Sequence, residues 1–164
     1  MHRSPGNDRE LIVIATHQRH TQPRGVRFAH DLRGEVQELL DALAAAIASG
    51  DATAVARLWE TPALVIGEEG VIHVTGPDDV TRWFADAQVQ VTARGLTSTH
   101  GDLIDLKRVG SRIVIATVRW PYLDASGHPV GAASADYTLR RDDAGQLKIR
   151  AVLLRGIESA PAAR

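Results

Sequence analysis

The chain has 164 residues, of which 44% are hydrophobic and 24% charged, and its formal net charge is -1. That size and composition fit one globular domain with a core of its own, and the near-zero charge argues against a general affinity for nucleic acid or anionic membranes. Because the chain has no cysteine, disulfides, thiolate catalysis and cysteine-ligated zinc are excluded. No apolar stretch approaches the roughly 18 residues that cross a bilayer, so we expect a cytoplasmic protein.

Residues 1–30 differ from the rest of the chain. They contain His2, His17, His20 and His30, are rich in arginine, and show no sustained hydrophobic period. This composition predicts a disordered head. The alternatives are a metal-binding tail built on the histidines, an arginine-rich presequence, and a true start of the protein nearer Val26 or Leu32.

Two helices are expected next. Asp31 is predicted to cap the first, which Gly50 ends. Its apolar residues recur at helical spacing and form one core-facing stripe, made of Val36, Leu39, Leu40, Leu43 and Ile47. Asp51 then caps a shorter helix. Its predicted face is Val55, Leu58 and Trp59, and Pro62 is its predicted stop.

Residues 63–67 and 71–74 are predicted to be two short strands. Gly76 and Pro77, followed by two aspartates, mark the start of a third helix that Gly95 ends. Its predicted inner face consists of Val80, Trp83, Phe84, Ala87 and Val91.

The rest of the chain has the pattern of an antiparallel sheet. Long strands are predicted at residues 96–109, 111–123, 128–141 and 146–157, separated by glycine- and aspartate-containing turns. One α+β domain is therefore expected over residues 31–158, with a short tail at 159–164.

Three stretches of sequence carry a family resemblance. They are LAAAIASGDATAVARLW, from Leu43 to Trp59, GVIHVTGPDDVTRWF, from Gly70 to Phe84, and YTLRRDDAGQLKIR, from Tyr137 to Arg150. Together with the predicted order of elements, these resemble the nuclear-transport-factor-2-like superfamily, also called SnoaL-like or ketosteroid-isomerase-like. The resemblance implies a cone-shaped curved antiparallel sheet around three N-terminal helices, with a pocket at the open end. Enzymes of that superfamily work by acid–base chemistry, whereas many other members only bind ligands or partners.

Two features depart from the isomerase-like members. The place where those members carry a carboxylate base falls here near Ile66 and Gly67, and Glu68, the nearest acid, is predicted to lie in a turn. The last strand carries polar side chains toward the pocket in many members. Here the corresponding residues are apolar, namely Leu147, Ile149, Ala151 and Leu153.

His100 and Asp102 are the candidate catalytic residues. Two residues apart on a strand, they share a face, and a carboxylate beside a buried imidazole orients it and raises its basicity. The alternative is a solvated strand end, because residues 97–102 are polar throughout.

The candidate ligand-binding residues are mostly aromatic. Trp120 and Tyr122 share a face on either side of Pro121, which implies a strand edge, bulge or end; such a cluster suits a pocket mouth, a dimer interface or plain core. Tyr137 is expected inside the cone and its neighbour Asp136 outside. Trp83 and His73 complete the set, although a structural role is the simpler one for both.

The leading hypothesis is a homodimeric domain with an apolar pocket for an unidentified small molecule. It implies no metal and no cofactor, and no nucleic-acid or membrane partner. The first alternative is a cofactor-independent lyase or isomerase that uses His100 and Asp102. The second is a protein-interaction module that docks a partner on its sheet.

Overall fold

The computed structural model describes residues 25–95, 97 and 100–159. The chain divides into two compact units, residues 1–31 and 32–164, and the account below concerns the second. Of the first unit, only the start of a helix at residues 25–31 is described. The structural prediction for residues 1–24, including His2, His17 and His20, and that for residues 160–164 lie outside the described residues.

Three helices precede the long strands. α1 spans Gly25–Ser49, α2 spans Ala52–Arg57 and α3 spans Pro77–Ala93. The predicted cap at Asp31 is wrong, because α1 already begins six residues earlier, at Gly25. The predicted cap of α2 is confirmed, since the side chain of Asp51 accepts a hydrogen bond from the backbone N–H of Ala54 at 3.0 Å.

The second helix ends earlier than the sequence suggested. It stops at Arg57, and Trp59 is the first residue of a strand rather than part of a helical face. Pro62 therefore lies inside that strand and does not end the helix. Trp59 is nevertheless buried in the core, as the apolar pattern predicted.

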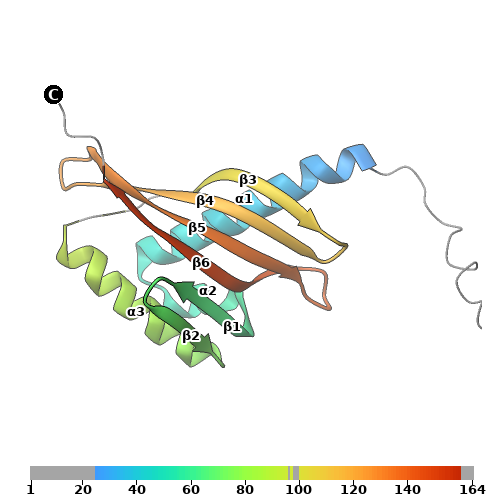
Figure 1. Cartoon of the computed structure of the whole chain (residues 1–164), viewed down its shortest axis with the longest axis horizontal. Coiled ribbons are helices and arrows are strands. Elements are labelled where there is room, and N and C mark those ends of the chain that lie inside the picture. The colour runs from blue at the N-terminus through green and yellow to red at the C-terminus, as the bar shows by residue number, and fades with distance from the viewer. Residues whose placement is uncertain (1–24, 96, 98–99, 160–164) are drawn as a thin grey trace, which may run out of the picture. The chain divides into compact units, whose positions relative to one another are not determined.

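Six strands form one curved, unclosed sheet (Figure 1). They are β1 (Trp59–Gly67), β2 (Gly70–Val74), β3 (Asp102–Val109), β4 (Ile113–Leu123), β5 (Pro129–Arg141) and β6 (Leu147–Ser159). Their order across the sheet is β2-β1-β6-β5-β4-β3. Neighbouring strands are antiparallel except β1 and β6, which are parallel. The sheet thus starts from a short hairpin and continues as a meander of long strands.

One side of the sheet packs against the helices, and we call it the helix-facing side; the other is the outer side. Buried residues alternate along β4, as expected for a strand with one covered face. They form a single core cluster with side chains of all three helices. From β4 this cluster includes Val114, Ala116, Val118 and Trp120, and from the helices Val36, Leu40, Val55 and Val80.

Pairing in register assigns the other strands to these two sides, because residues opposite each other in a ladder share a face. Ala116 is opposite Tyr137, and Tyr137 is opposite Val152. The prediction that Tyr137 points inward and Asp136 outward is confirmed, since Tyr137 is buried and Asp136 bonds on the outer side to Thr117.

A break in register corrects the predicted inner face of β6. Leu147 and Ile149 are buried as expected, but the pairing shifts between Thr138 and Leu139. Such a bulge adds a residue and moves the following side chains to the other face. Val152 is therefore buried, whereas Leu153, predicted to face inward, is 44% exposed on the outer side.

A two-pronged ion pair joins α1 to the end of β5. Arg141 donates from Nη1 to Glu35 Oε1 at 2.6 Å and from Nη2 to Glu35 Oε2 at 2.9 Å. This contact raises the pKa of Arg141 further. Two parallel donors give this contact a defined geometry as well as strength.

Candidate functional site

The polar centre of the helix-facing side is a tryptophan–tyrosine pair. Trp120 on β4 donates from Nε1 to the hydroxyl oxygen of Tyr137 on β5 at 3.1 Å, and both side chains are buried. The two residues are not opposite each other, because Trp120 is paired with Ala133 and Tyr137 with Ala116. The side chains therefore lean toward each other along the sheet, across a span of about 13 Å of strand.

Small residues on β5 leave room for this arrangement. On the helix-facing side, the positions that follow Tyr137 toward the start of the strand are Ala135, Ala133 and Gly131. Ala135 is buried and Ala133 is partly exposed. At this end of the sheet β5 therefore carries only small side chains, whereas β4 on one side carries aromatic and β6 on the other side aliphatic side chains.

Gly101 packs against the far edge of the Trp120 ring. A Cβ atom added at Gly101 would lie 3.0–3.1 Å from three carbons of the indole, closer than side chains normally approach. The carbonyl of Gly101 also accepts a hydrogen bond from Gln37 Nε2 of α1 at 3.3 Å. Trp120 is thus held between a glycine on one side and Tyr137 on the other.

Tyr122 lies on the same side of the sheet, one inward position beyond Trp120, and is half-buried. Burial raises its pKa, and the positive charge of Arg94, just beyond α3, acts in the opposite direction.

Burial raises the pKa of Tyr137 to about 12; the hydrogen bond from Trp120 acts to lower this pKa, and Tyr122 acts to raise it. The neutral phenol is the form that fits this dry position, because ionisation would bury a charge without a cation. Tyr137 is consequently a hydrogen-bond donor and acceptor at any ordinary pH.

The raised pKa predicts a loss of stability in alkali. Below pH 10 the folded and unfolded chains both hold the Tyr137 proton, so its contribution is complete. Between pH 10 and 12 only the unfolded chain ionises, and the free energy of unfolding should fall by about 1.4 kcal/mol per unit, up to about 3 kcal/mol. Urea unfolding at several pH values measures this fall, and Tyr137→Phe should remove most of it. An equal fall in that variant would contradict the assignment.

The helix-facing side is uncovered at one end of the sheet. Along β6 the exposed fraction rises from 1% at Val152 to 41% at Leu154 and 57% at Ile157. Leu154 is opposite Ala135 and Ile157 is opposite Ala133, so both share the side of the Trp120–Tyr137 pair. Large apolar side chains on the core side of a sheet are normally covered, and here they are open to solvent.

The side chains of His100 and Asp102 lie close together, but not on the face of the sheet that carries the aromatic residues. His100 precedes β3, and Asp102 is its first residue. Nε2 of His100 lies 3.3 Å from Oδ1 of Asp102, with the side chains 55% and 44% exposed. Asp102 is opposite Arg119, an outer-side residue of β4. The register therefore separates Asp102 from the face that carries Trp120 and Tyr137.

The remaining predicted residues are dispersed. Trp83 is half-buried on α3 and meets Trp59 edge to face, with ring centroids 5.8 Å apart. The indole Nε1 of Trp59 is buried without a hydrogen-bond partner among the described residues. His73 is exposed on β2 and is opposite Leu64 on the outer side, so it does not join the aromatic group.

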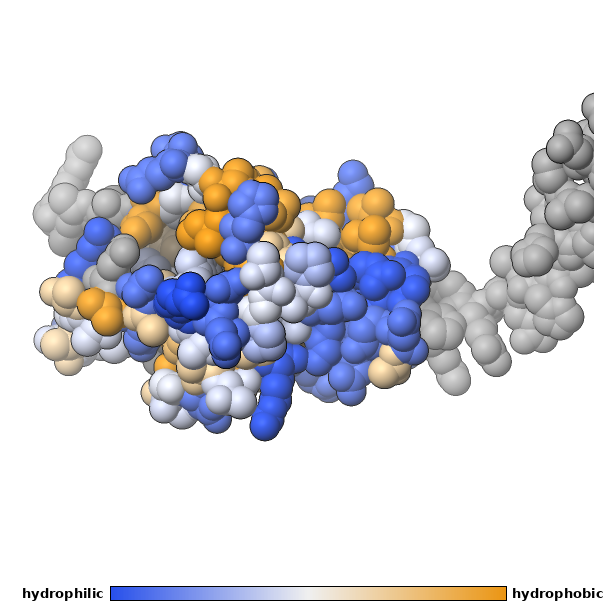
Figure 2. All heavy atoms as spheres, turned by 90° about the horizontal axis from the view of Figure 1, so that it is seen from below, coloured by the Kyte–Doolittle hydropathy of each residue, from blue (hydrophilic) through white to orange (hydrophobic). Residues whose placement is uncertain are grey.

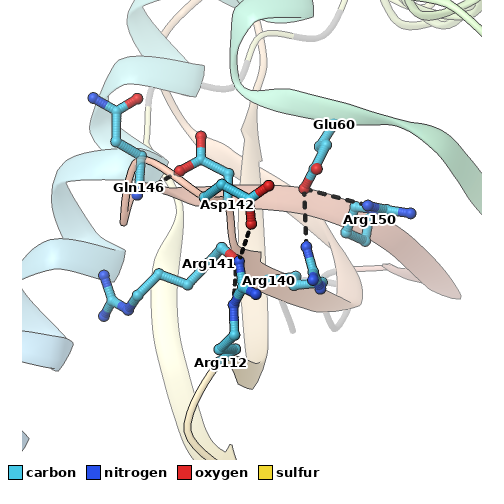
Figure 3. Close-up of polar contacts among 8 residues, drawn as sticks. Glu60, Arg112, Arg140, Arg141, Asp142, Gln146 and Arg150 are labelled. Atoms are coloured by element: carbon cyan, nitrogen blue, oxygen red, sulfur yellow. Dashed lines mark hydrogen bonds and ion pairs between the residues drawn. The ribbon is translucent and has the colours of Figure 1, made fainter.

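The outer side carries its own polar cluster near the start of β1 (Figure 3). Oε2 of Glu60 lies 3.2 Å from Arg150 and 3.7 Å from Arg140, in ion pairs that lack hydrogen-bond geometry. Nearby, Arg112 donates to Asp143 at 2.9 Å, across the ends of two hairpins. Each of these arginines thus has a carboxylate partner within the chain, and Arg140 and Arg150 share one.

Two negative findings concern the described residues alone. No three His, Cys, Asp or Glu side chains among them are grouped closely enough to hold a metal ion. None of the helices described has both the length and the apolar character needed to cross a membrane.

Sequence reasoning missed Gly101 and the bond between Trp120 and Tyr137. The density of aromatic residues around Pro121 singled out the right segment, but only the register of β4 against β5 shows which side chains meet. Gly101 gave no signal, because its role depends on the ring that packs against it.

The sequence matches a known family over most of its length. Residues 34–156 match the family described as NTF2-like protein (DUF6841). A search of curated proteins found no match.

Solved structures with similar folds share little sequence with this chain. A cystatin-like domain of unknown function from Nostoc punctiforme has a TM-score of 0.60 at 16% identity, over 74% of this chain and 75% of that one. An NTF2-like protein from Novosphingobium aromaticivorans has a TM-score of 0.59 at 20% identity, over 79% and 83%. A ketosteroid isomerase-like protein from Erwinia carotovora atroseptica has a TM-score of 0.54 at 11% identity, over 78% and 96%. These structures, which share the cystatin-like fold, confirm the predicted α+β fold of a curved antiparallel sheet with N-terminal helices.

Proposed function

The chain belongs to the NTF2-like protein family DUF6841, and on that basis we propose that it is a small-molecule-binding domain. Its binding site is the uncovered end of the helix-facing side. The observation that carries this proposal is the exposure of Leu154 and Ile157 beside the buried Trp120–Tyr137 pair. An apolar surface with a few convergent polar groups is the usual form of a small-ligand site.

The geometry supports a pocket bounded on three sides. In this proposal Ala133 and Gly131 form the floor, Trp120 and Tyr122 one wall, and the aliphatic side chains of β6 the other, because the strand register places all of them on the helix-facing side. The half-buried state of Tyr122 suits a residue at the mouth of such a pocket. The predicted ligand residues Trp120, Tyr122 and Tyr137 thus remain in this proposal, whereas His73 lies on the other side of the sheet.

A neutral apolar dye tests this proposal. Nile red should bind saturably with one molecule per chain, and native mass spectrometry of the purified protein should detect the complex. The proposal fails if the fluorescence rises linearly with dye concentration and no complex is detected.

Acid–base catalysis is the weaker candidate. Its support is the 3.3 Å contact between His100 and Asp102 and the fold likeness to a ketosteroid isomerase-like protein. However, both side chains are about half exposed, and a general base normally needs a perturbing, drier environment. If a reaction is found, Asp102→Asn should keep the fold and abolish turnover. Unchanged turnover in that variant would remove this pair as the catalyst.

We also propose that two copies pair through the outer side of the sheet. That side exposes apolar residues on several strands, including Ile113 at 37%, Leu153 at 44% and Val71 at 51%. Figure 2 shows that hydrophobic residues gather in exposed patches on the face seen from below. Apolar patches on a small protein are commonly covered by association, most often as a two-fold dimer.

Light scattering should therefore give twice the 17.7 kDa chain mass at micromolar concentration. Leu153→Lys should shift the protein toward the monomer, because it places a charge within the covered face. Val89→Lys is the matched control, since Val89 lies on α3 and is 68% exposed. A clean monomer for the natural sequence would disprove the pairing.

A further inference from the structure

We propose that Arg140 and Arg150, on the outer side of the sheet, form a binding site for the phosphate group of a small soluble molecule. The site lies on the opposite side of the sheet from the proposed pocket for an apolar ligand. The inference therefore goes beyond that proposal and does not depend on it.

A shared carboxylate brings the two arginines together (Figure 3). Nη1 of Arg150 lies 3.2 Å, and Nη1 of Arg140 3.7 Å, from the same oxygen, Oε2 of Glu60. The two nitrogens are therefore at most about 7 Å apart, the sum of those distances. Hydrogen bonds of about 2.9 Å to two different oxygens of one phosphate group can span a gap of that size.

A bulge in β6 places Arg150 at this point. The pairing of β6 with β5 passes from Ile149 to Ala151, so Arg150 is the residue that the bulge adds. An added residue of this kind re-aims a side chain. Ile149 stays in the core, while Arg150 reaches Glu60 on the neighbouring strand β1.

The positive charges of this corner outnumber the carboxylates that contact them. Lys148 is opposite Arg140 and donates to the backbone carbonyl of Arg57 at 2.6 Å, so it adds a charge without using a carboxylate. Among the described residues, Glu60 is the one carboxylate within ion-pair distance of Lys148, Arg140 or Arg150. This surplus suits a phosphate monoester, which carries about two negative charges at neutral pH.

The two arginines also keep their hydrogen-bond donors available. Neither guanidinium group donates a hydrogen bond within the part of the chain that the structure describes, because the contacts with Glu60 lack the geometry. By contrast, Arg155 donates to Asp136 at 2.8 Å and Arg112 to Asp143 at 2.9 Å. The proposed site is 28% exposed at one arginine and 35% at the other, so an anion can reach it while salt screens it only in part.

Phenyl phosphate is the probe, and benzoate is its carboxylate counterpart with a single charge. Isothermal titration calorimetry and the width of the phosphorus NMR line report direct binding. A melting temperature alone would mislead, because phosphate stabilises many proteins by exclusion from their surface. With two charge-assisted hydrogen bonds, the dissociation constant of phenyl phosphate should be on the order of millimolar, and benzoate should bind more weakly.

Three variants locate the site. Arg150→Gln should weaken the binding of phenyl phosphate about tenfold or more, because it removes a charge-assisted donor. Glu60→Gln should tighten it about fivefold, because it removes a repelling charge. Arg119→Gln is the matched control, since Arg119 lies on the same side but about 20 Å along β4 from Ile113, the partner of Arg140. It should leave the affinity within about twofold.

The inference is overturned if phenyl phosphate does not bind, if benzoate binds as tightly, or if Arg150→Gln and Arg119→Gln lose affinity equally. Arg140→Gln replaces Arg150→Gln in case the latter does not fold. Vesicles of phosphatidylcholine with phosphatidic acid present the same group on a membrane, and binding confined to them would overturn the soluble source. None of these outcomes changes the Nile red result, so the two proposals fail separately.

Discussion

Replacing Ala133 with leucine should weaken the binding of Nile red by about tenfold or more and leave the protein folded. Ala133 is partly exposed, lies opposite Trp120 on one strand and Ile157 on the other, and has only a methyl group to place there. Three further carbons would fill the space that we assign to the ligand. Forcing a ligand past an overfilled site costs about 1–3 kcal/mol, so the affinity should fall by about tenfold or more.

Ser134→Leu is the matched control for this experiment. It adds a leucine to the same strand one residue away, and its partners Arg119 and Gly156 place it on the outer side of the sheet. Dye titration and thermal unfolding should show unchanged binding and a melting temperature within a few degrees of the natural sequence. Equal losses of binding in both variants would mean that the dye does not occupy the helix-facing end. Unchanged binding in Ala133→Leu would show that Ala133 does not line the site where the dye binds.

The fold was accessible from the sequence because local signals agree with one another. The stripe of Leu39, Leu40 and Leu43 marks a helix face, and all three are buried in the core. The aspartate that caps α2 was identified for the same reason, since a cap acts through its own neighbours. The start of α1 was missed because periodicity identifies the packed part of a helix, and Asp31 can serve as a cap or lie within the helix.

The sequence alone could not predict the register in which neighbouring strands pair. The run from Ala151 to Leu154 is apolar at every position, so it fits either face of β6, and only the shift in pairing selects Val152 and Leu154 for the helix-facing side. The same limit applies to the site. Alternation places Trp120 and Tyr122 on one face. It cannot show that Tyr137, whose partner on β4 is Ala116, meets Trp120 four residues further along that strand.

The proposed roles of the two candidate sites follow from this difference. His100 and Asp102 are close in sequence, so their contact could be predicted without knowing the fold, and it lies where solvent reaches both side chains. The Trp120–Tyr137 pair is distant in sequence and buried. A buried polar pair fixed by tertiary packing is the better candidate for a preorganised binding group.

Among the substitutions discussed, Trp120→Ala should lower the free energy of unfolding most, by about 3–5 kcal/mol. The substitution removes a buried ring, opens a cavity next to Gly101 and leaves the oxygen of Tyr137 without its donor. For a chain of this size, thermal unfolding should register a drop of roughly 10 °C or more. A drop of only a few degrees would mean that the ring is not an essential part of the core.

Gly101→Ala in the two backgrounds then tests whether Trp120 is held in the way that the structure implies. In the natural sequence the new methyl group would lie 3.0–3.1 Å from the indole, so the free energy of unfolding should fall by about 1–3 kcal/mol. In the Trp120→Ala background the same methyl group meets the cavity, so its cost should disappear or change sign. A double-mutant cycle from urea unfolding measures this coupling, which should exceed about 1 kcal/mol. Additive effects would show that Gly101 does not support the ring, and the proposed preorganisation of Tyr137 would then lose its structural basis.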